Sequence, residues 1–228
     1  MTPFEYTEWP CPALGGGTRE EIALAFDKGR SQRMLILPAW FDEANKMRRL
    51  TVEVMRRLDM AGIDCILPDL PGCNESTAPL RDQTLDGWRI AASSAASLYR
   101  ATHVLAIRAG ALLAPEGLPG WHYAPLAGRQ VLRAMIRART IAAREAGVPE
   151  RSEDLENLGR ADGIELAGWH IGADMFSALE TAVPASDLSE IEQGAIAGPA
   201  LWLRAEPGDD PSQADALAAI VAIAMSVS

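Results

Sequence analysis

The stretch THVLAIRAGALLA, residues 102–114, decides how the rest of the chain is interpreted. Its first part, HVLAI, is a continuous apolar run of the length expected for a strand that is buried on both faces. The Arg-Ala-Gly that follows is where the chain turns, and Ala-Leu-Leu-Ala resembles the start of a helix. The stretch therefore predicts a buried strand, a tight turn at residues 108–110, and a helix after the turn.

The segments before this stretch alternate between short apolar runs and longer amphipathic ones. Apolar residues recur at three- and four-residue steps between residues 41 and 62, where Gly62 is placed to end a helix. Thr84 is a suitable N-cap for a second helix. We expect strands at 20–26, 33–38, 63–68 and 103–107, and helices at 41–62 and 84–101. This alternation predicts the α/β class, with a doubly wound and mostly parallel sheet.

The second half of the chain is less regular. Residues 128–147 predict a strong helix that Gly147 ends, the segment 198–210 predicts a final strand, and a last helix is expected to begin near Pro211. With 228 residues the chain is long enough for one packed domain, residues 1–228. We expect residues 121–198 to form a small helical lid inserted before the last strand.

Composition excludes several classes of function. The net charge of −10 disfavours binding to nucleic acid or to an anionic membrane surface. Three cysteines without CxxC spacing and three histidines without i, i+4 pairing predict no disulfide framework, no metal site and no cofactor. No apolar run is long enough for a membrane span, and residues 1–12 lack the features of a signal peptide, so we expect a cytoplasmic protein.

Ligands of open α/β sheets bind beyond the carboxyl ends of the strands. In this chain those ends are expected at residues 38–41, 69–72 and 108–110. The turn Ala106-Ile107-Arg108-Ala109-Gly110, called the elbow below, occupies the place of the G-x-S-x-G turn of α/β-hydrolases, which carries a nucleophilic serine. Arg108 stands where that serine would be, and no histidine follows His170. A Ser-His triad is therefore not expected.

Three blocks carry a closer resemblance: LILPAWFDEANKMRR, LPDLPGCNES and AIRAGALLA. Together with WHYAPLAGRQVLRAMIRARTIA and IELAGWHI, they resemble the exosortase A system-associated hydrolases of the type called hydrolase 2, over about residues 20–205. The resemblance implies an α/β-hydrolase fold and a cytosolic protein linked to exopolysaccharide and protein-sorting systems of Gram-negative bacteria. It also implies partner proteins from such a system, and it names no substrate.

Arg108 is the central candidate of the predicted site. An arginine has too high a pKa to act as a base, and it is no nucleophile, but its planar fork binds carboxylate or phosphate groups through two hydrogen bonds. At the tip of a central strand and above a helix N-terminus, it predicts an anion pocket. The alternative is an internal ion pair with Asp69, Glu43 or Glu75.

The loop after the second expected strand supplies further candidates. Trp40 or Phe41 would offer a backbone N–H to an oxyanion, next to the backbone of Ala109. Glu43 and Lys46 are candidates for activating water, and Lys46 is one of only two lysines in the chain. Asn45 is a candidate ligand-binding residue; each of these side chains could instead belong to an ordinary helix start.

The segment DLPGCNES predicts a structural turn. Asp69 is expected to brace it, and Asn74 tolerates the positive φ that the turn requires. Both are also candidate ligand-binding residues. Cys73 is a possible nucleophile, although a buried and inert thiol is the better interpretation.

The helix at 128–147 carries Arg129, Arg133 and Arg137 at i, i+4 steps, here called the arginine stripe. The stripe predicts either a contact surface for an anionic glycan or lipid-linked phosphate, or a solvated face balanced by the acids Glu150, Glu153, Asp154 and Glu156. His170 is expected to be structural. Asp209 and Asp210 are expected to belong to the turn before the last helix.

These residues lead to three hypotheses about function. The chain is a degenerate hydrolase that binds an anionic small molecule or glycan intermediate, or a hydrolase in which Glu43 or Lys46 activates water while Arg108 stabilises an oxyanion. The third hypothesis is a non-catalytic scaffold that binds a partner protein of the same system through its lid.

Overall fold

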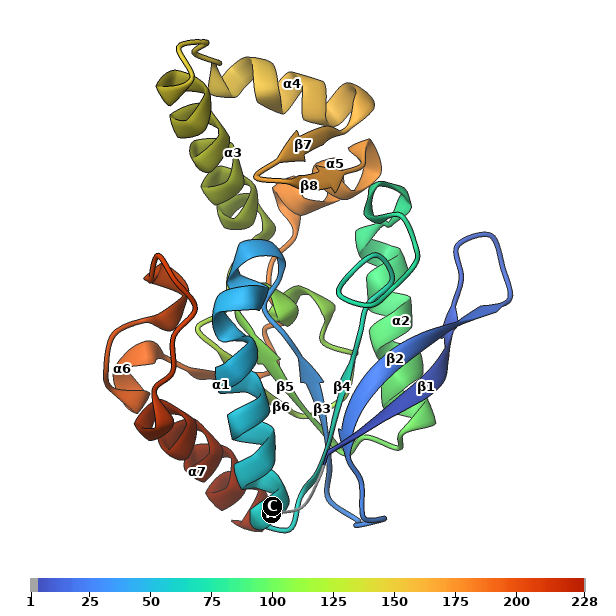
Figure 1. Ribbon diagram of the computed structural model, residues 1–228. Coiled ribbons are helices and arrows are strands. Elements are labelled where there is room, and N and C mark those ends of the chain that lie inside the picture. Colours follow the sequence, from blue (N-terminus) through green and yellow to red (C-terminus); the bar gives the residue numbers. More distant parts are fainter. Residues whose placement is uncertain (1–3, 228) are drawn as a thin grey trace.

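The computed structural model describes residues 4–227 and has a seven-stranded sheet at its centre (Figure 1). The strand order is β1-β2-β4-β3-β5-β6-β9, in which β1, β2 and β4 are antiparallel neighbours and the strands from β4 to β9 run parallel. The strands are β1 (Glu5–Pro12), β2 (Thr18–Phe26), β3 (Arg33–Leu37), β4 (Asp64–Pro68), β5 (His103–Ile107), β6 (Gly120–Tyr123) and β9 (Ser189–Ile191). The α/β class and the mostly parallel sheet are confirmed.

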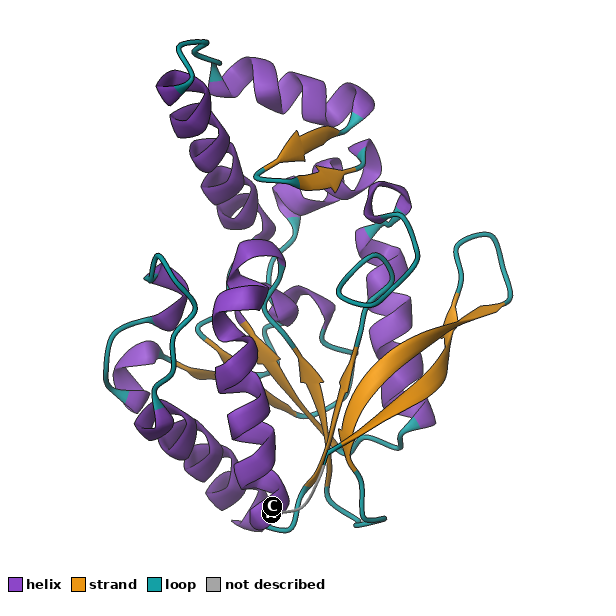
Figure 2. Ribbon diagram, viewed as in Figure 1, coloured by secondary structure: helices purple, strands orange, loops and turns teal. Residues whose placement is uncertain are grey.

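Helices cover both faces of this sheet (Figure 2). α1 (Phe41–Met60) and α7 (Pro211–Val227) lie together on one face, and α2 (Leu85–Leu98) lies on the other. The central strands are buried almost throughout, since both faces contact helices. Two hydrophobic cores result, one on each face of the sheet.

The helix boundaries follow the capping residues that the sequence offers. The Thr84 hydroxyl accepts a hydrogen bond from the Gly87 N–H at 3.0 Å and so caps α2. Gly62 and Gly147 have φ values of +90° and +78°, in the left-handed region where a glycine ends a helix without strain. The predictions for these three residues are confirmed.

A smaller unit, called the cap, spans residues 128–181 between β6 and β9. It contains α3 (Gly128–Glu145), α4 (Ser152–Asp162), the hairpin of β7 (Ile164–Leu166) and β8 (Trp169–Ile171), and α5 (Ala173–Thr181). Figure 1 shows the cap at the top of the molecule, beyond the carboxyl ends of the parallel strands. The predicted lid range, 121–198, is too wide, because β6 and β9 at its two ends pair in the main sheet.

The predicted final strand at 198–210 is wrong. This segment contains only a short 3-10 helix, Leu201–Leu203, and the last strand is instead β9, which follows the cap. Pro199 and Pro207 explain the difference, because proline has no N–H to donate to a sheet. The segment between these prolines does not extend the sheet, and Trp202 within it packs against Arg108 of the elbow. The short helix α6 (Gln193–Ile196) lies between β9 and this segment.

A cluster of ion pairs lies at the end of the sheet opposite the cap. Arg33 Nη2 is 2.6 Å from Asp27 Oδ2, and Arg33 Nη1 is 3.3 Å from Asp64 Oδ2. The hydrogen bond from Arg33 lowers the pKa of Asp27 from 3.8 to about 2. The folded state therefore holds the Asp27 carboxylate in its charged form at lower pH than the unfolded chain does.

We predict that this aspartate contributes to acid unfolding. Its stabilising effect is complete above the unfolded pKa, near 4, and is lost as the pH falls toward about 2, where the folded carboxyl is protonated. Urea unfolding of the Asp27→Asn variant should show a shallower loss of stability between pH 4 and pH 2 than the parent. Asp82→Asn, which changes an exposed carboxylate, is the control. Identical pH slopes for the parent and Asp27→Asn would contradict the assignment.

Candidate functional site

The elbow has the backbone shape of a strained strand-to-helix turn. Arg108 follows the last residue of β5 and has a φ of +55°, which is uncommon for any residue with a side chain. Gly110 lies directly against the end of β3, so that a Cβ there would be 2.4 Å from the Leu37 carbonyl oxygen. The close approach explains the glycine, and it places residue 108 above the middle of the sheet.

The segment after the elbow is a short helix. Residues Arg108–Leu113 form a 3-10 helix of six residues, called η2, which agrees with the short stretch of chain between Gly110 and Trp121. The expected support of Arg108 by a helix dipole therefore does not apply, because such a short helix aligns few peptide dipoles. Any electrostatic role of Arg108 depends on its own side chain.

The Arg108 side chain is bound inside the protein on three sides. Its Nε and Nη2 donate to the two carboxylate oxygens of Glu43 at 2.9 and 3.0 Å, and its Nη1 donates to the Ala124 carbonyl at 2.7 Å. The guanidinium carbon lies 3.9 Å above the centre of the Trp202 ring. The arginine is only 7% exposed. Glu43 is thus the internal partner among the three acids that the sequence offered.

This arrangement changes what the elbow can do chemically. The bidentate pair with Glu43 occupies the N–H groups on the edge of the guanidinium that would otherwise bind an anionic ligand. Both oxygens of Glu43 are likewise occupied, which leaves this carboxylate poorly placed to accept a proton from water. An incoming anion would have to displace Glu43 before Arg108 could hold it.

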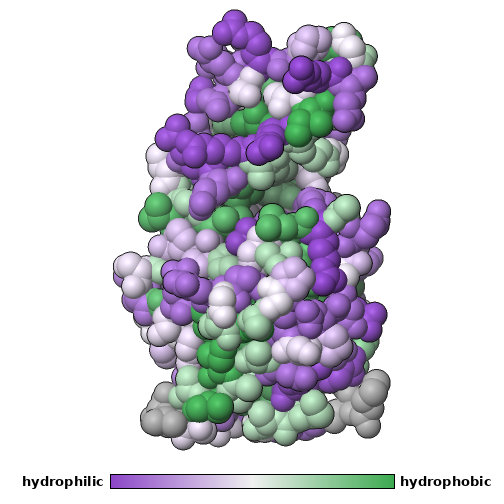
Figure 3. Space-filling view, turned by 90° about the vertical axis from the view of Figure 1, so that its left-hand side faces the viewer, coloured by the Kyte–Doolittle hydropathy of each residue, from purple (hydrophilic) through white to green (hydrophobic). Residues whose placement is uncertain are grey.

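A cavity of about 430 Å³ lies beside the elbow, between the cap and the main sheet. Figure 3 shows apolar side chains at the level where the cap meets the rest of the molecule. Ala109 of the elbow and the exposed Leu203 both line this cavity. The other lining residues are Trp40, Phe41, Asp42, Glu43, Lys46, Leu126, Val131, Ala134, Met135, Ala138, Ala167 and Trp202. We call it the elbow cavity.

One edge of the elbow cavity is polar. Lys46 Nζ is 2.6 Å from Asp42 Oδ2, one turn earlier on α1, and Glu43 is held by Arg108. Each cation at this edge therefore has an acidic partner, and the formal charges of the four side chains cancel. The cavity consequently combines an apolar body with a polar but electrically balanced end.

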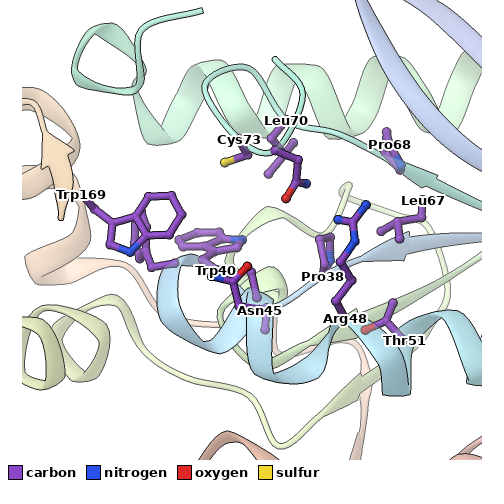
Figure 4. Close-up of a pocket in the computed structure, with 14 residues that line it drawn as sticks. Pro38, Trp40, Asn45, Arg48, Thr51, Leu67, Pro68, Leu70, Cys73 and Trp169 are labelled. Carbon is purple, nitrogen blue, oxygen red and sulfur yellow. The ribbon is translucent and has the colours of Figure 1, made fainter. Parts of the chain in front are cut away.

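A second cavity, of about 50 Å³, is also lined by Trp40 and Phe41, and Figure 4 shows Trp40 within its lining. Asn45 and Arg48 border it from α1, and Trp169 borders it from the cap. The other lining residues are Pro38, Ala39, Ala44, Thr51, Leu67, Pro68, Leu70, Cys73 and Asn74. We call it the small cavity. Trp40 and Phe41 line both cavities and separate them.

Trp40 and Phe41 also hold the β3–α1 loop in place. The Trp40 ring packs at 5.0 Å from that of Trp88, and the Phe41 ring at 5.5 Å from that of Trp169 in the cap. Phe41 has a φ of +54°, so this loop is as strained as the elbow. The first N–H groups of a helix have no partner within it, and Phe41 begins α1. The N–H of Phe41 and that of Ala109 stay candidates for contacting a ligand in the elbow cavity.

The turn after β4 has the predicted structure. Asn74 has a φ of +48°, and its side-chain amide donates to Asp69 Oδ1 at 2.5 Å. Burial raises the pKa of Asp69, and burial also raises that of the Cys73 thiol to about 12. Such a thiol carries no thiolate at neutral pH, which agrees with an inert Cys73. Asp69 itself lines neither cavity.

Other residues that the sequence singled out lie away from the elbow. His170 is an exposed residue of the β7–β8 hairpin, and its Nε2 is 3.6 Å from Glu165 Oε2. Asp209 pairs with Arg49 at 2.7 Å, and Asp210 accepts a hydrogen bond from the Gln213 N–H in the first turn of α7. Asp210 therefore has the helix-start role that was predicted, whereas Asp209 connects this segment to α1 through Arg49.

The arginine stripe is exposed along α3. Its expected acidic partners pair with arginines outside the stripe: Glu150 with Arg139, Glu153 with Arg151, and Glu156 with Arg160. The stripe is therefore a solvated face, as one of the two predictions had it, but three of the four acids expected to balance it pair elsewhere. Its use as a contact surface stays a prediction.

Sequence reasoning missed two parts of the site. Trp202, which covers the Arg108 guanidinium, lies in the segment that was predicted to be a strand. Val131 and Met135 face the elbow cavity from α3, and their helical spacing indicated only an apolar face. No local signal connects any of these residues to the elbow.

Within residues 4–227, no group of three or more His, Cys, Asp or Glu side chains is placed to hold a metal ion. No helix of the same region combines the length and the apolar character that crossing a membrane requires.

Comparison with known proteins identifies the fold. Among solved structures, a proposed hydrolase from Agrobacterium vitis is 15% identical, with a TM-score of 0.52, and covers 99% of each chain. The mouse alpha/beta hydrolase domain-containing protein 10 is 12% identical, with a TM-score of 0.59 and the same coverage. No protein-family model and no curated protein sequence matches the chain. The chain has the α/β-hydrolase fold, and identities this low show the fold alone.

We predict that the stability of the folded protein depends on the ion pair between Arg108 and Glu43. Glu43→Gln removes the countercharge of a buried guanidinium and should lower the free energy of unfolding by about 2 kcal/mol. The loss is smaller than for a fully buried ion pair, because the Glu43 side chain is partly exposed to solvent. Asp42→Asn on the same turn is the matched control, because its exposed pair with Lys46 should contribute less than about 0.5 kcal/mol. Urea unfolding measures both. Equal losses in the two variants would show that the Arg108 pair is energetically unimportant.

Proposed function

We propose that this α/β-hydrolase-fold protein binds a small, mostly apolar molecule with a polar end in the elbow cavity, and that it does so without covalent catalysis. The observation that carries the proposal is the cavity of about 430 Å³ directly beside an elbow whose side chain is an internally bound arginine. A volume of this size is within the range of small-molecule sites in proteins.

The lining of the cavity supports this ligand chemistry. Most of its side chains are apolar and come from α3, α1 and the segment at Trp202, so burying a hydrocarbon body there is favourable. Glu43, Lys46 and the backbone of Ala109 lie at one side, where they can hydrogen-bond a polar end. A preference for a negatively charged end stays open, because the cations near the cavity already have acidic partners.

The residues argue against ordinary hydrolytic turnover. Arg108 cannot form an acyl-enzyme, and none of the three histidines of the chain lines the elbow cavity. Glu43, the candidate for activating water, has both oxygens on Arg108. We therefore propose a binding role, in the sense of a pseudoenzyme, ahead of the hydrolase that uses Glu43 or Lys46.

The biological setting is a further part of the proposal. A role in an exosortase-linked exopolysaccharide system, a glycan intermediate as ligand, partner proteins from that system and a cytoplasmic location all rest on the sequence alone. A scaffold that binds a protein through the cap is the second candidate, and the exposed arginine stripe on α3 is the observation that favours it.

Filling the cavity provides the direct test. Ala134 on α3 lines the elbow cavity, and Ala134→Trp should fill part of it. We predict that titration with medium-chain carboxylic acids, alcohols and methyl esters changes the intrinsic tryptophan fluorescence, because Trp40 and Trp202 line the cavity. In Ala134→Trp the affinity should fall at least about tenfold, which corresponds to about 1.4 kcal/mol.

Ala219→Trp is the matched control for this titration. Ala219 is an exposed alanine on α7 that lines neither cavity, so its replacement should leave the affinity unchanged. A similar loss in both variants, or no binding by any compound of the series, would overturn the proposed function. A higher affinity for the acids than for the esters would identify an anionic end.

A second prediction concerns the chemistry of the elbow. We expect that a fluorophosphonate probe, which reacts with activated serines, does not label the protein, because residue 108 is arginine. Arg108→Ser should also stay unlabelled, since no histidine lines the cavity to deprotonate the new hydroxyl. Mass spectrometry of the intact protein measures the adduct. Labelling of the parent protein would contradict the prediction, because it would show that an activated nucleophile lies outside the elbow.

A further inference from the structure

The small cavity contains a buried hydrogen-bond donor without an acceptor. Trp40 is 4% exposed, and its indole Nε1 has no hydrogen-bond partner among the described residues. Leaving such a donor unpaired in a folded protein is costly, by about 1–3 kcal/mol. Trp40 lines the small cavity, and Figure 4 shows its indole beside Asn45 at the centre of the close-up. The donor therefore points to an acceptor outside the part of the chain that the structure describes.

A cation borders the same cavity. Arg48 lies on α1 and is exposed, and no ion pair or side-chain hydrogen bond joins it to another described residue. Its neighbour Arg49 pairs with Asp209 instead. The Arg48 charge acts on the carboxyl of Asp69. Burial raises the pKa of Asp69, and the hydrogen bond from Asn74 and the charge of Arg48 oppose that rise. Arg48 can therefore turn to a bound anion without breaking an existing contact.

The other polar group at this cavity is the Asn45 amide, which can donate as well. A cavity of about 50 Å³ has room for more than one water, and for a group of a few heavy atoms, but not for a sugar or a phosphate ester. Two or three donors that converge on a space of this size fit a planar carboxylate.

We propose that the small cavity is a carboxylate-binding subsite, in which the Trp40 indole N–H and the Arg48 guanidinium hold a carboxylate group. This inference goes beyond the proposed function and does not depend on it, because the Trp40 and Phe41 rings separate the two cavities. It assigns a role to Arg48, whereas the adjacent Arg49 pairs with Asp209.

The test follows the NMR signal of the Trp40 indole N–H. In the ¹⁵N-labelled full chain each of the six tryptophans gives one indole N–H signal, and Trp40→Phe identifies that of Trp40. Sodium acetate is titrated at constant ionic strength, with sodium chloride as the replaced salt. We expect a saturable shift of the Trp40 signal, and Arg48→Met should raise the dissociation constant about tenfold.

Two control variants distinguish acetate bound in the small cavity from a general charge effect and from acetate bound in the elbow cavity. Arg49→Met removes an adjacent charge that does not line the small cavity, and it should leave the dissociation constant within about twofold. Ala134→Trp fills the elbow cavity and should leave the acetate response intact, whether or not the proposed function holds. A Trp40 signal that does not saturate, an equal effect of Arg49→Met, or loss of the response in Ala134→Trp would each overturn the inference.

Discussion

The bidentate pair between Arg108 and Glu43 connects the end of β5 to the first turn of α1. It crosses the place where the strands of an α/β-hydrolase fold present their reactive side chain. A guanidinium with little exposure to water is stable only with a countercharge and further acceptors, and Glu43, the Ala124 carbonyl and the Trp202 ring supply them. The elbow is thus used to hold the structure together, and the chemistry has to come from what surrounds it.

The backbone of the site resembles that of a reactive elbow more closely than its side chains do. Arg108 and Phe41 both have φ near +55°, and Gly110 packs against the end of β3 without room for a Cβ. Each strained residue costs on the order of 1 kcal/mol, which the packing around it has to offset. The strain persists although residue 108 is no nucleophile, and it gives the loops beside the two cavities a fixed shape.

The two cavities differ in the ligand that each can hold. The elbow cavity is large and apolar with a polar edge, whereas the small cavity is narrow and is lined by an indole donor and an arginine that have no partner within residues 4–227. The rings of Trp40 and Phe41 form the wall between them, and the contact of Phe41 with Trp169 connects that wall to the cap. A displacement of the cap would therefore alter both cavities together.

The sequence predicted the parts of the fold that depend on neighbouring residues. The strands from β2 to β5, helix α1 with Gly62, the Thr84 cap of α2 and the Asn74 turn all have local signatures. The strand β9 has only three residues, too few to show a periodic pattern, and the apolar run within 198–210 resembles a strand although its flanking prolines cannot donate to a sheet.

The sequence by itself determined that a central apolar strand ends in Arg108, and that the strand belongs to a doubly wound sheet, because periodicity and turn residues act over a few positions. Only the tertiary structure decided which acid that arginine meets. Glu43 lies 65 residues away, and Asp69 and Glu75 were equally eligible by type. The choice depends on how α1 packs beside β5, and the two cavities depend on where the cap lies, which no local pattern encodes.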